Sequence, residues 1–200
     1  ADDDILAALS FIGSKEIVIV TNTVTSPTSL KVLENFKVKF PTAKIYSYEL
    51  FNDSVKNSAW RKTYGSGNYP LVKWNEAKII LTLESDFLGT EGNKVETARL
   101  FAESRDVNSK SFNRLYTVDS SLTITGINSD YRLRLRPEAQ YEFVMSLMNE
   151  LGNKAALNIS VNTNGFSLNS FAEKYNLKKE VLNHLVSDLA SNKGKAIIDA

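Results

Sequence analysis

Residues 114–126 read Arg114-Leu115-Tyr116-Thr117-Val118-Asp119-Ser120-Ser121-Leu122-Thr123-Ile124-Thr125-Gly126, an apolar strand pattern that ends in an acid and a polar turn. The chain continues through an Asn128/Asp130 corner into the alternating run Tyr131-Arg132-Leu133-Arg134-Leu135-Arg136, and Pro137 then opens a predicted helix. The pattern indicates two extended segments joined by a polar corner. A strand that ends in polar side chains is how α/β proteins present groups to nucleotide-like ligands.

Strand and helix patterns alternate along the rest of the chain. Strands are predicted at 16–21, 43–48, 77–83, 114–118 and 195–200, and helices at 3–12, 27–40, 53–64, 93–106, 137–151, 168–175 and 178–190. This order predicts an α/β fold, with a parallel Rossmann-like sheet and helices on both faces. We expect residues 1–152 to form the α/β domain, and residues 153–200 to complete it with a loop, a helical pair and the terminal strand. Because α/β chains rarely stop on a strand, we expect an excised domain of a longer protein.

The sequence also predicts the burial of one strand, the cap of one helix and the inner face of another. The apolar run Ile17-Val18-Ile19-Val20 predicts a buried parallel strand. Ser26 is expected to cap the next helix, with Pro27 at its first position. The apolar stripe expected to face inward on helix 137–151 is Tyr141, Val144, Leu147, Met148 and Leu151.

Composition restricts the kinds of site that the chain can build. It has 200 residues, a formal charge of +1, one histidine and no cysteine. Without cysteine there is no disulfide, thiolate zinc site or iron–sulfur ligation within it. The balanced charge does not favour nucleic acid, and no apolar run approaches the roughly 20 residues of a membrane-spanning helix. We therefore expect neither nucleic-acid binding nor direct membrane insertion.

Polar loops at strand ends are the candidate ligand sites, because parallel sheets bind ligands at the carboxyl ends of their strands. The three loops are Thr21–Ser26, Glu84–Gly92 and Asp119–Gly126. None contains a dinucleotide fingerprint or a P-loop. The alternative is that these residues only cap helices and shape turns, and for Ser26 we favour the cap.

Other residues allow two interpretations each. Arg132, Arg134 and Arg136 share one face of a strand, so they either bind an anion or a partner protein or form the solvated face of an edge strand. Trp60 and Trp74 either stack on a ligand or pack in the interior. His184 falls on the polar side of helix 178–190 and is predicted to lie at the surface.

Two strings carry a resemblance to a known family. Asp86-Phe87-Leu88-Gly89-Thr90, and Leu122-Thr123-Ile124-Thr125-Gly126-Ile127-Asn128-Ser129-Asp130, together with Thr25-Ser26-Pro27 and the strands around 77–81 and 115–119, resemble the molybdopterin oxidoreductases. The similarity spans residues 15–150 or so. It is closest to the large iron–sulfur, molybdopterin-oxidoreductase-like subunit of alternative complex III.

The resemblance implies a site as well as a fold. By family position, Glu84, Ser85 and Asp86 match one loop that holds the guanine-nucleotide end of a molybdopterin cofactor, and Asp119, Ser120 and Ser121 match another. Phe87 and Leu88 stand where catalytic relatives have a small turn, and we expect their bulk to fill the cofactor's space. No catalytic residue and no metal ligand is expected.

The resemblance therefore favours a non-catalytic scaffold domain without a cofactor of its own. It would belong to a membrane-associated respiratory complex that oxidises quinols, on the periplasmic side of a bacterial membrane, with other subunits as partners. The alternative is an enzyme domain that binds part of a molybdopterin guanine dinucleotide, with Asp86 and Asp119 accepting hydrogen bonds from guanine. A third interpretation is a protein-interaction module centred on the arginine face at 132–136.

Overall fold

The computed structural model of the chain describes residues 2–11, 15–68, 71–108, 112–157 and 159–200. These residues form two compact units, Ala1–Tyr69 and Pro70–Ala200. The expectation that residues 153–200 complete the domain formed by residues 1–152 stays a prediction. Residue 12, the last of the helix predicted at 3–12, lies outside the described residues.

The first unit contains two strands and three helices: α1 (Asp2–Ser10), β1 (Val18–Thr21), α2 (Pro27–Lys39), β2 (Lys44–Ser47) and α3 (Ser54–Tyr64). β1 and β2 pair in parallel, with Val18 opposite Lys44. Ser26 caps α2 as predicted, since its Oγ accepts a hydrogen bond from the Ser29 N–H at 3.4 Å. Gly65 ends α3 in the left-handed conformation, at φ 68°.

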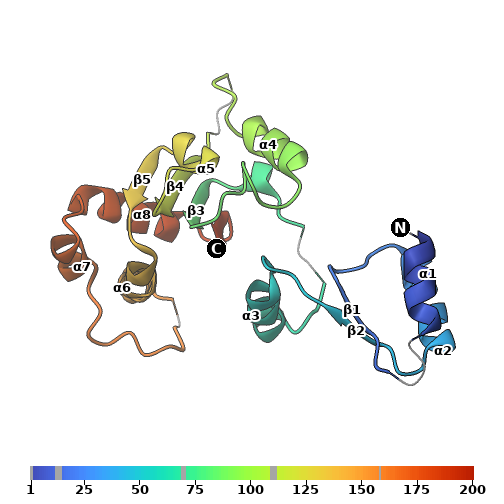
Figure 1. Cartoon of the computed structure of the whole chain (residues 1–200). Coiled ribbons are helices and arrows are strands. Elements are labelled where there is room, and N and C mark those ends of the chain that lie inside the picture. The colour runs from blue at the N-terminus through green and yellow to red at the C-terminus, as the bar shows by residue number, and fades with distance from the viewer. Residues whose placement is uncertain (1, 12–14, 69–70, 109–111, 158) are drawn as a thin grey trace. The chain divides into compact units, whose positions relative to one another are not determined.

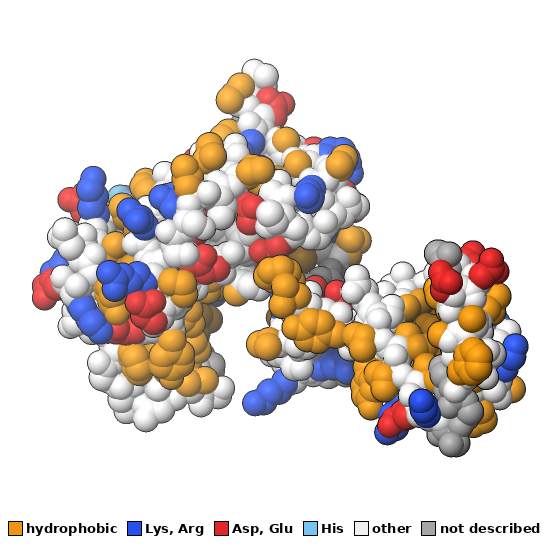
Figure 2. Space-filling view, viewed as in Figure 1, with side chains coloured by type: hydrophobic (Ala, Val, Ile, Leu, Met, Phe, Trp, Pro, Cys, Tyr) orange, Lys and Arg blue, Asp and Glu red, His pale blue; other side chains and the backbone are white. Residues whose placement is uncertain are grey.

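The prediction that the first strand is buried is wrong for the described structure. Val18 and Val20 are 55% and 68% exposed. Ala43 is the only described residue of this unit that is fully buried, and hydrophobic side chains gather over the unit's surface in Figure 2. The helices α1, α2 and α3 contain no fully buried residue either. The three helices therefore do not form a core with the two strands.

The second unit is built on a four-stranded sheet with the order β5-β4-β3-β6, all parallel (Figure 1). Its elements are η1 (Trp74–Glu76), β3 (Ile79–Leu83), α4 (Lys94–Glu103), β4 (Arg114–Asp119), α5 (Ile124–Ile127), β5 (Tyr131–Arg134), η2 (Pro137–Ala139), α6 (Gln140–Ala155), α7 (Leu168–Lys174), α8 (Lys179–Ser191) and β6 (Ala196–Asp199). The prediction of a parallel Rossmann-like α/β sheet is confirmed.

Helices cover both faces of this sheet. Successive strand residues point to opposite faces, so each strand contributes side chains to both. One face places Leu81, Tyr116 and Val118 against α6, α7 and α8. The other face places Ile80 and Leu115 in a smaller cluster with Trp74, Phe87 and Phe101. Both central strands are therefore buried on both sides, as expected for a parallel sheet.

Two local expectations are corrected. Helix 137–151 begins as a 3-10 turn at Pro137 and continues as α6. Phe143, absent from the predicted stripe, is fully buried, whereas Tyr141 is exposed. The polar loop after β4 also contains α5. This helix is a single turn, so it is too short to show a helical periodicity in the sequence. The helices 168–175 and 178–190 and the terminal strand are confirmed as α7, α8 and β6.

Candidate functional site

The residues that the sequence singled out meet at the carboxyl ends of β3 and β4. Glu84, Ser85 and Asp86 follow β3, and Asp119 is the last residue of β4. The two strands are hydrogen-bonded neighbours, so their polar ends lie at the same edge of the sheet. Ser120 joins them through hydrogen bonds to Glu84, and Ser121 is exposed.

Glu84 links three segments of the chain. One carboxylate oxygen, Oε1, accepts hydrogen bonds from the Ser120 N–H at 2.9 Å and from Gln140 Nε2 at 2.8 Å. The other oxygen, Oε2, lies 3.2 Å from Ser120 Oγ. Glu84 adopts a positive φ of 58°, which is uncommon outside glycine. Its carboxylate thus fastens the turn after β3 to the turn after β4 and to the start of α6.

Ser85 is buried between two further carboxylates. Its hydroxyl lies 2.6 Å from Asp199 Oδ2 and 3.2 Å from Glu91 Oε2. A hydroxyl has one proton to donate, and the shorter contact identifies Asp199 as its acceptor. Glu91 Oε1 also accepts the Asp86 N–H at 2.8 Å. These contacts tie the loop after β3 to the end of β6.

Asp86 binds α5. Its Oδ1 accepts hydrogen bonds from both the N–H and the hydroxyl of Thr125, each at 2.9 Å. The Thr125 hydroxyl in turn accepts the Leu88 N–H at 3.1 Å. The second carboxylate oxygen, Oδ2, packs so closely on Gly89 that a Cβ there would lie 2.0 Å away. Only glycine fits this turn as it stands.

Asp119 is 1% exposed and forms an ion pair with Arg132, whose Nη2 lies 2.7 Å from Asp119 Oδ1. Within the described residues, however, neither Asp119 Oδ1 nor Arg132 Nε makes a hydrogen bond. Thr123 Oγ1 lies 3.4 Å from Asp119 Oδ2 and also accepts the Gly126 N–H at 2.9 Å. A Cβ on Gly126 would lie 2.6 Å from Asp119 Oδ2.

Among the donors to these acids, Gln140 was not singled out from the sequence, and Thr123 and Thr125 were named only as part of the candidate loop Asp119–Gly126. Arg132 was singled out only as part of an exposed arginine face. Arg134 and Arg136 are indeed exposed, and β5 is an edge strand as expected. The alternation of arginine and leucine could not show that Arg132 alone turns toward a buried acid, because that acid belongs to another strand.

Phe87 lies in the core and not at the strand ends. It is 3% exposed, stacks on Trp74 with ring centroids 4.1 Å apart and meets Phe101 edge-on. Leu88 packs partly buried against the same cluster. The bulk of Phe87 and Leu88 therefore packs with Trp74 and Phe101. The groups beside Asp86 are Thr125 and Gly89, and those beside Asp119 are Arg132 and Gly126. Trp74 proves to be a packing residue.

His184 is exposed, as predicted, and its ring lies 6.4 Å from that of Tyr131. Within the described ranges, no group of three or more histidine, aspartate or glutamate side chains could hold a metal ion. Over the same ranges, every helix is too short or too polar to cross a membrane.

The two acids that the resemblance assigns to the guanine end of a molybdopterin cofactor both make contacts within the chain. A carboxylate that binds guanine needs an oxygen turned toward the ligand. Asp86 and Asp119 are buried, and both are engaged by the chain's own donors. No protein-family model matches this chain, and no curated protein matches it significantly.

Proposed function

We propose that this chain is a non-catalytic scaffold domain of a molybdopterin oxidoreductase-like subunit. The observation that supports this most directly is the engagement of Glu84, Asp86 and Asp119 by donors of the chain itself. Each acid joins two or more segments, so it contributes to the fold at the edge where related domains would bind a ligand.

The two strings behind the family resemblance are in direct contact. Asp86 of the first string binds Thr125 of the second, and Leu88 donates to the same threonine. Their residue types are explained by packing: Gly89 and Gly126 each face a carboxylate that leaves no room for a Cβ. This supports a domain that keeps the family's framework for structural reasons.

The proposal includes the setting that the resemblance implies. The domain would serve a membrane-associated respiratory complex that oxidises quinols, on the periplasmic side of a bacterial membrane, with other subunits as its partners. It would hold no cofactor. The competing function, an enzyme domain that binds part of a molybdopterin guanine dinucleotide, is the outcome that the following experiment could reveal.

Titration of the chain with GMP and GDP tests for the cofactor. A ligand that binds only the native state raises the free energy of unfolding by about 2.7 kcal/mol at a hundredfold excess over Kd. We expect no saturable increase in the urea midpoint with either nucleotide. A saturable increase that disappears in Asp119→Asn would overturn the proposal in favour of the enzyme domain.

Purification from native membranes tests the partners. A complex captured through an epitope tag on this chain should contain further subunits, oxidise a quinol and contain no molybdenum in stoichiometric amount by elemental analysis. Recovery of the chain alone, without quinol oxidation, would refute the scaffold function. Stoichiometric molybdenum bound to this domain would refute the absence of a cofactor.

A further inference from the structure

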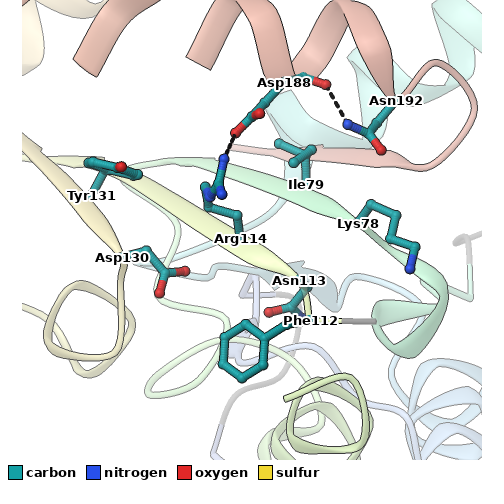
Figure 3. A pocket seen from close by; sticks show the side chains of 9 residues that line it. All are labelled: Lys78, Ile79, Phe112, Asn113, Arg114, Asp130, Tyr131, Asp188 and Asn192. Atoms are coloured by element: carbon teal, nitrogen blue, oxygen red, sulfur yellow. Dashed lines mark hydrogen bonds and ion pairs between the residues drawn. The ribbon is translucent and has the colours of Figure 1, made fainter. Parts of the chain in front are cut away.

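A cavity lies at the opposite edge of the same sheet, at the amino ends of its strands. Its volume is about 590 Å³, which is within the range of small-molecule sites. Residues at the starts of β3, β4 and β5 line it together with the end of α8, and Figure 3 shows their side chains. Nothing in the proposed function uses this edge, so the inference is independent of it.

The charges that line this cavity cancel. Two cations, Lys78 and Arg114, face two acids, Asp130 and Asp188. Arg114 Nη1 lies 2.5 Å from Asp188 Oδ2, a contact drawn in Figure 3. Asp130 is paired with Arg105, just outside the cavity lining. Each of the two arginines at this edge is therefore already paired with an acid, which weakens its attraction for a phosphate or another anion.

One wall of the cavity is the aromatic ring of Phe112, which contacts Arg105. The Arg105 guanidinium lies 4.9 Å from the Phe112 ring centroid and 4.8 Å from that of Phe101, so it contacts both rings. Arg105 also donates from Nε to Asn113 Oδ1 at 2.9 Å. Phe112 is nevertheless 49% exposed. A fixed ring with a large accessible area suits the apolar face of a flat or ring-shaped ligand.

The polar wall has hydrogen-bonding capacity beyond its internal contacts. Asp188 accepts from Arg114 and from the Tyr116 hydroxyl at 2.6 Å, but a carboxylate has about four acceptor positions. Arg114 has five N–H donors, and its side chain is 46% exposed. Asn192 is anchored at the end of α8 by its Nδ2 donating to the Asp188 carbonyl at 2.8 Å. Hydroxyl groups, which both donate and accept, match such a mixed wall.

We infer that this cavity binds a small, uncharged, hydroxyl-rich ligand of the sugar class. The ring of the ligand would lie on Phe112, and its hydroxyls would bond to Arg114 and Asp188. The charged partners strengthen bonds to neutral hydroxyls, while their cancellation disfavours an anion such as a nucleotide. This assigns a binding site and no reaction.

Amide NMR spectra of the whole 15N-labelled chain test the inference, with maltose and N-acetylglucosamine as probes and AMP as an anionic comparison at matched ionic strength. NMR is preferred to thermal shift because sugars stabilise proteins nonspecifically by exclusion from their surface. At least one sugar should produce saturable shifts confined to residues 78–79, 112–114, 130–131 and 188–192, and AMP should not.

Variants identify the ring that carries binding. Phe112→Ala and the bulk-retaining Phe112→Leu should each weaken sugar binding about tenfold, with spectra elsewhere unchanged. Tyr141→Ala, which removes an exposed ring on α6, should bind like the wild type. The inference is overturned if neither sugar gives saturable shifts, if Phe112→Leu binds as tightly as the wild type, or if AMP binds the cavity and the sugars do not.

Discussion

Arg132 and Arg134 stand two residues apart on β5 but have different surroundings. Arg132 pairs with the buried Asp119, whereas Arg134 is exposed. Removing one partner of a buried pair leaves an uncompensated charge, which commonly costs 3–5 kcal/mol. Because Arg132 is 27% exposed, we expect Arg132→Met to lower the free energy of unfolding by about 3 kcal/mol, as measured by urea denaturation.

Arg134→Met is the matched control on the same strand, and it should change the free energy of unfolding by less than about 0.5 kcal/mol. The double variant Asp119→Asn/Arg132→Met should recover part of the loss, because the acid is then neutral. Equal effects of the two arginine variants would show that Asp119 does not depend on Arg132.

At the scale of elements, α5 is a single turn that depends on the loops around it. The Thr125 hydroxyl donates to Asp86 and accepts from Leu88, and it is fully buried. Thr125→Val keeps the shape and leaves these two groups without that partner. We expect a loss of about 1–3 kcal/mol, together with faster amide hydrogen exchange at Ile127 and Asn128, whose N–H groups bond within this turn.

Thr117→Val is the control for this change. The Thr117 hydroxyl is also buried, but within the described residues it has no hydrogen-bond partner. Its removal should therefore leave stability unchanged or raise it by up to about 1 kcal/mol. If Thr117→Val destabilised the protein as much as Thr125→Val, the hydrogen bonds to Asp86 and Leu88 would not explain the result.

Tyr116 and Asp188 join β4 to α8, and this contact predicts an alkaline pH dependence. Burial, together with the hydrogen bond to Asp188, raises the pKa of Tyr116 well above its ordinary value. Above pH 10 or so the unfolded tyrosine loses its proton while the folded one keeps it, so the free energy of unfolding falls as pH rises. The contribution is complete below that pH.

Urea midpoints at pH 9 and pH 11 measure this effect. The fall between them should be smaller in Tyr116→Phe, which has no proton to lose, by at most about 1.4 kcal/mol per pH unit. Tyr141→Phe, at an exposed tyrosine, should fall as far as the wild type. An identical fall in Tyr116→Phe and the wild type would contradict the raised pKa.

At the scale of the whole molecule, the two units differ in how much they bury. The first has one fully buried described residue, Ala43, and the second has two clusters on either side of its sheet. Since apolar burial is the main source of stability, we expect the first unit to unfold at lower urea and with a shallower transition than the second.

Each unit carries one tryptophan, which makes the comparison direct. Trp74→Phe leaves Trp60 to report on the first unit, and Trp60→Phe leaves Trp74 to report on the second. Fluorescence from Trp60 should change at clearly lower urea than fluorescence from Trp74. Superimposable transitions in the two variants would show that the chain unfolds as one cooperative body.

Local sequence was sufficient for the strands and most helices. β3 and β4 were predictable because each is a short and mostly apolar run, and α2 because Ser26 caps it and Pro27 is its first residue. The convergence of Glu84, Asp86 and Asp119 also followed, since the carboxyl ends of neighbouring parallel strands meet. The assignment of each element uses residues close together in the chain, and the convergence of the acids follows from the general geometry of parallel strands.

Tertiary structure alone decided which acids are paired and which apolar strand is covered. Arg132 reaches Asp119 only because β5 joins the edge of β4 in one register, and Asp86 meets Thr125 across 39 positions of sequence. Ile17–Val20 looks like a core strand, yet Val18 and Val20 stay exposed because the described helices of its unit do not bury them. Pairing and burial depend on distant residues, and for that reason neither can be read from a local pattern.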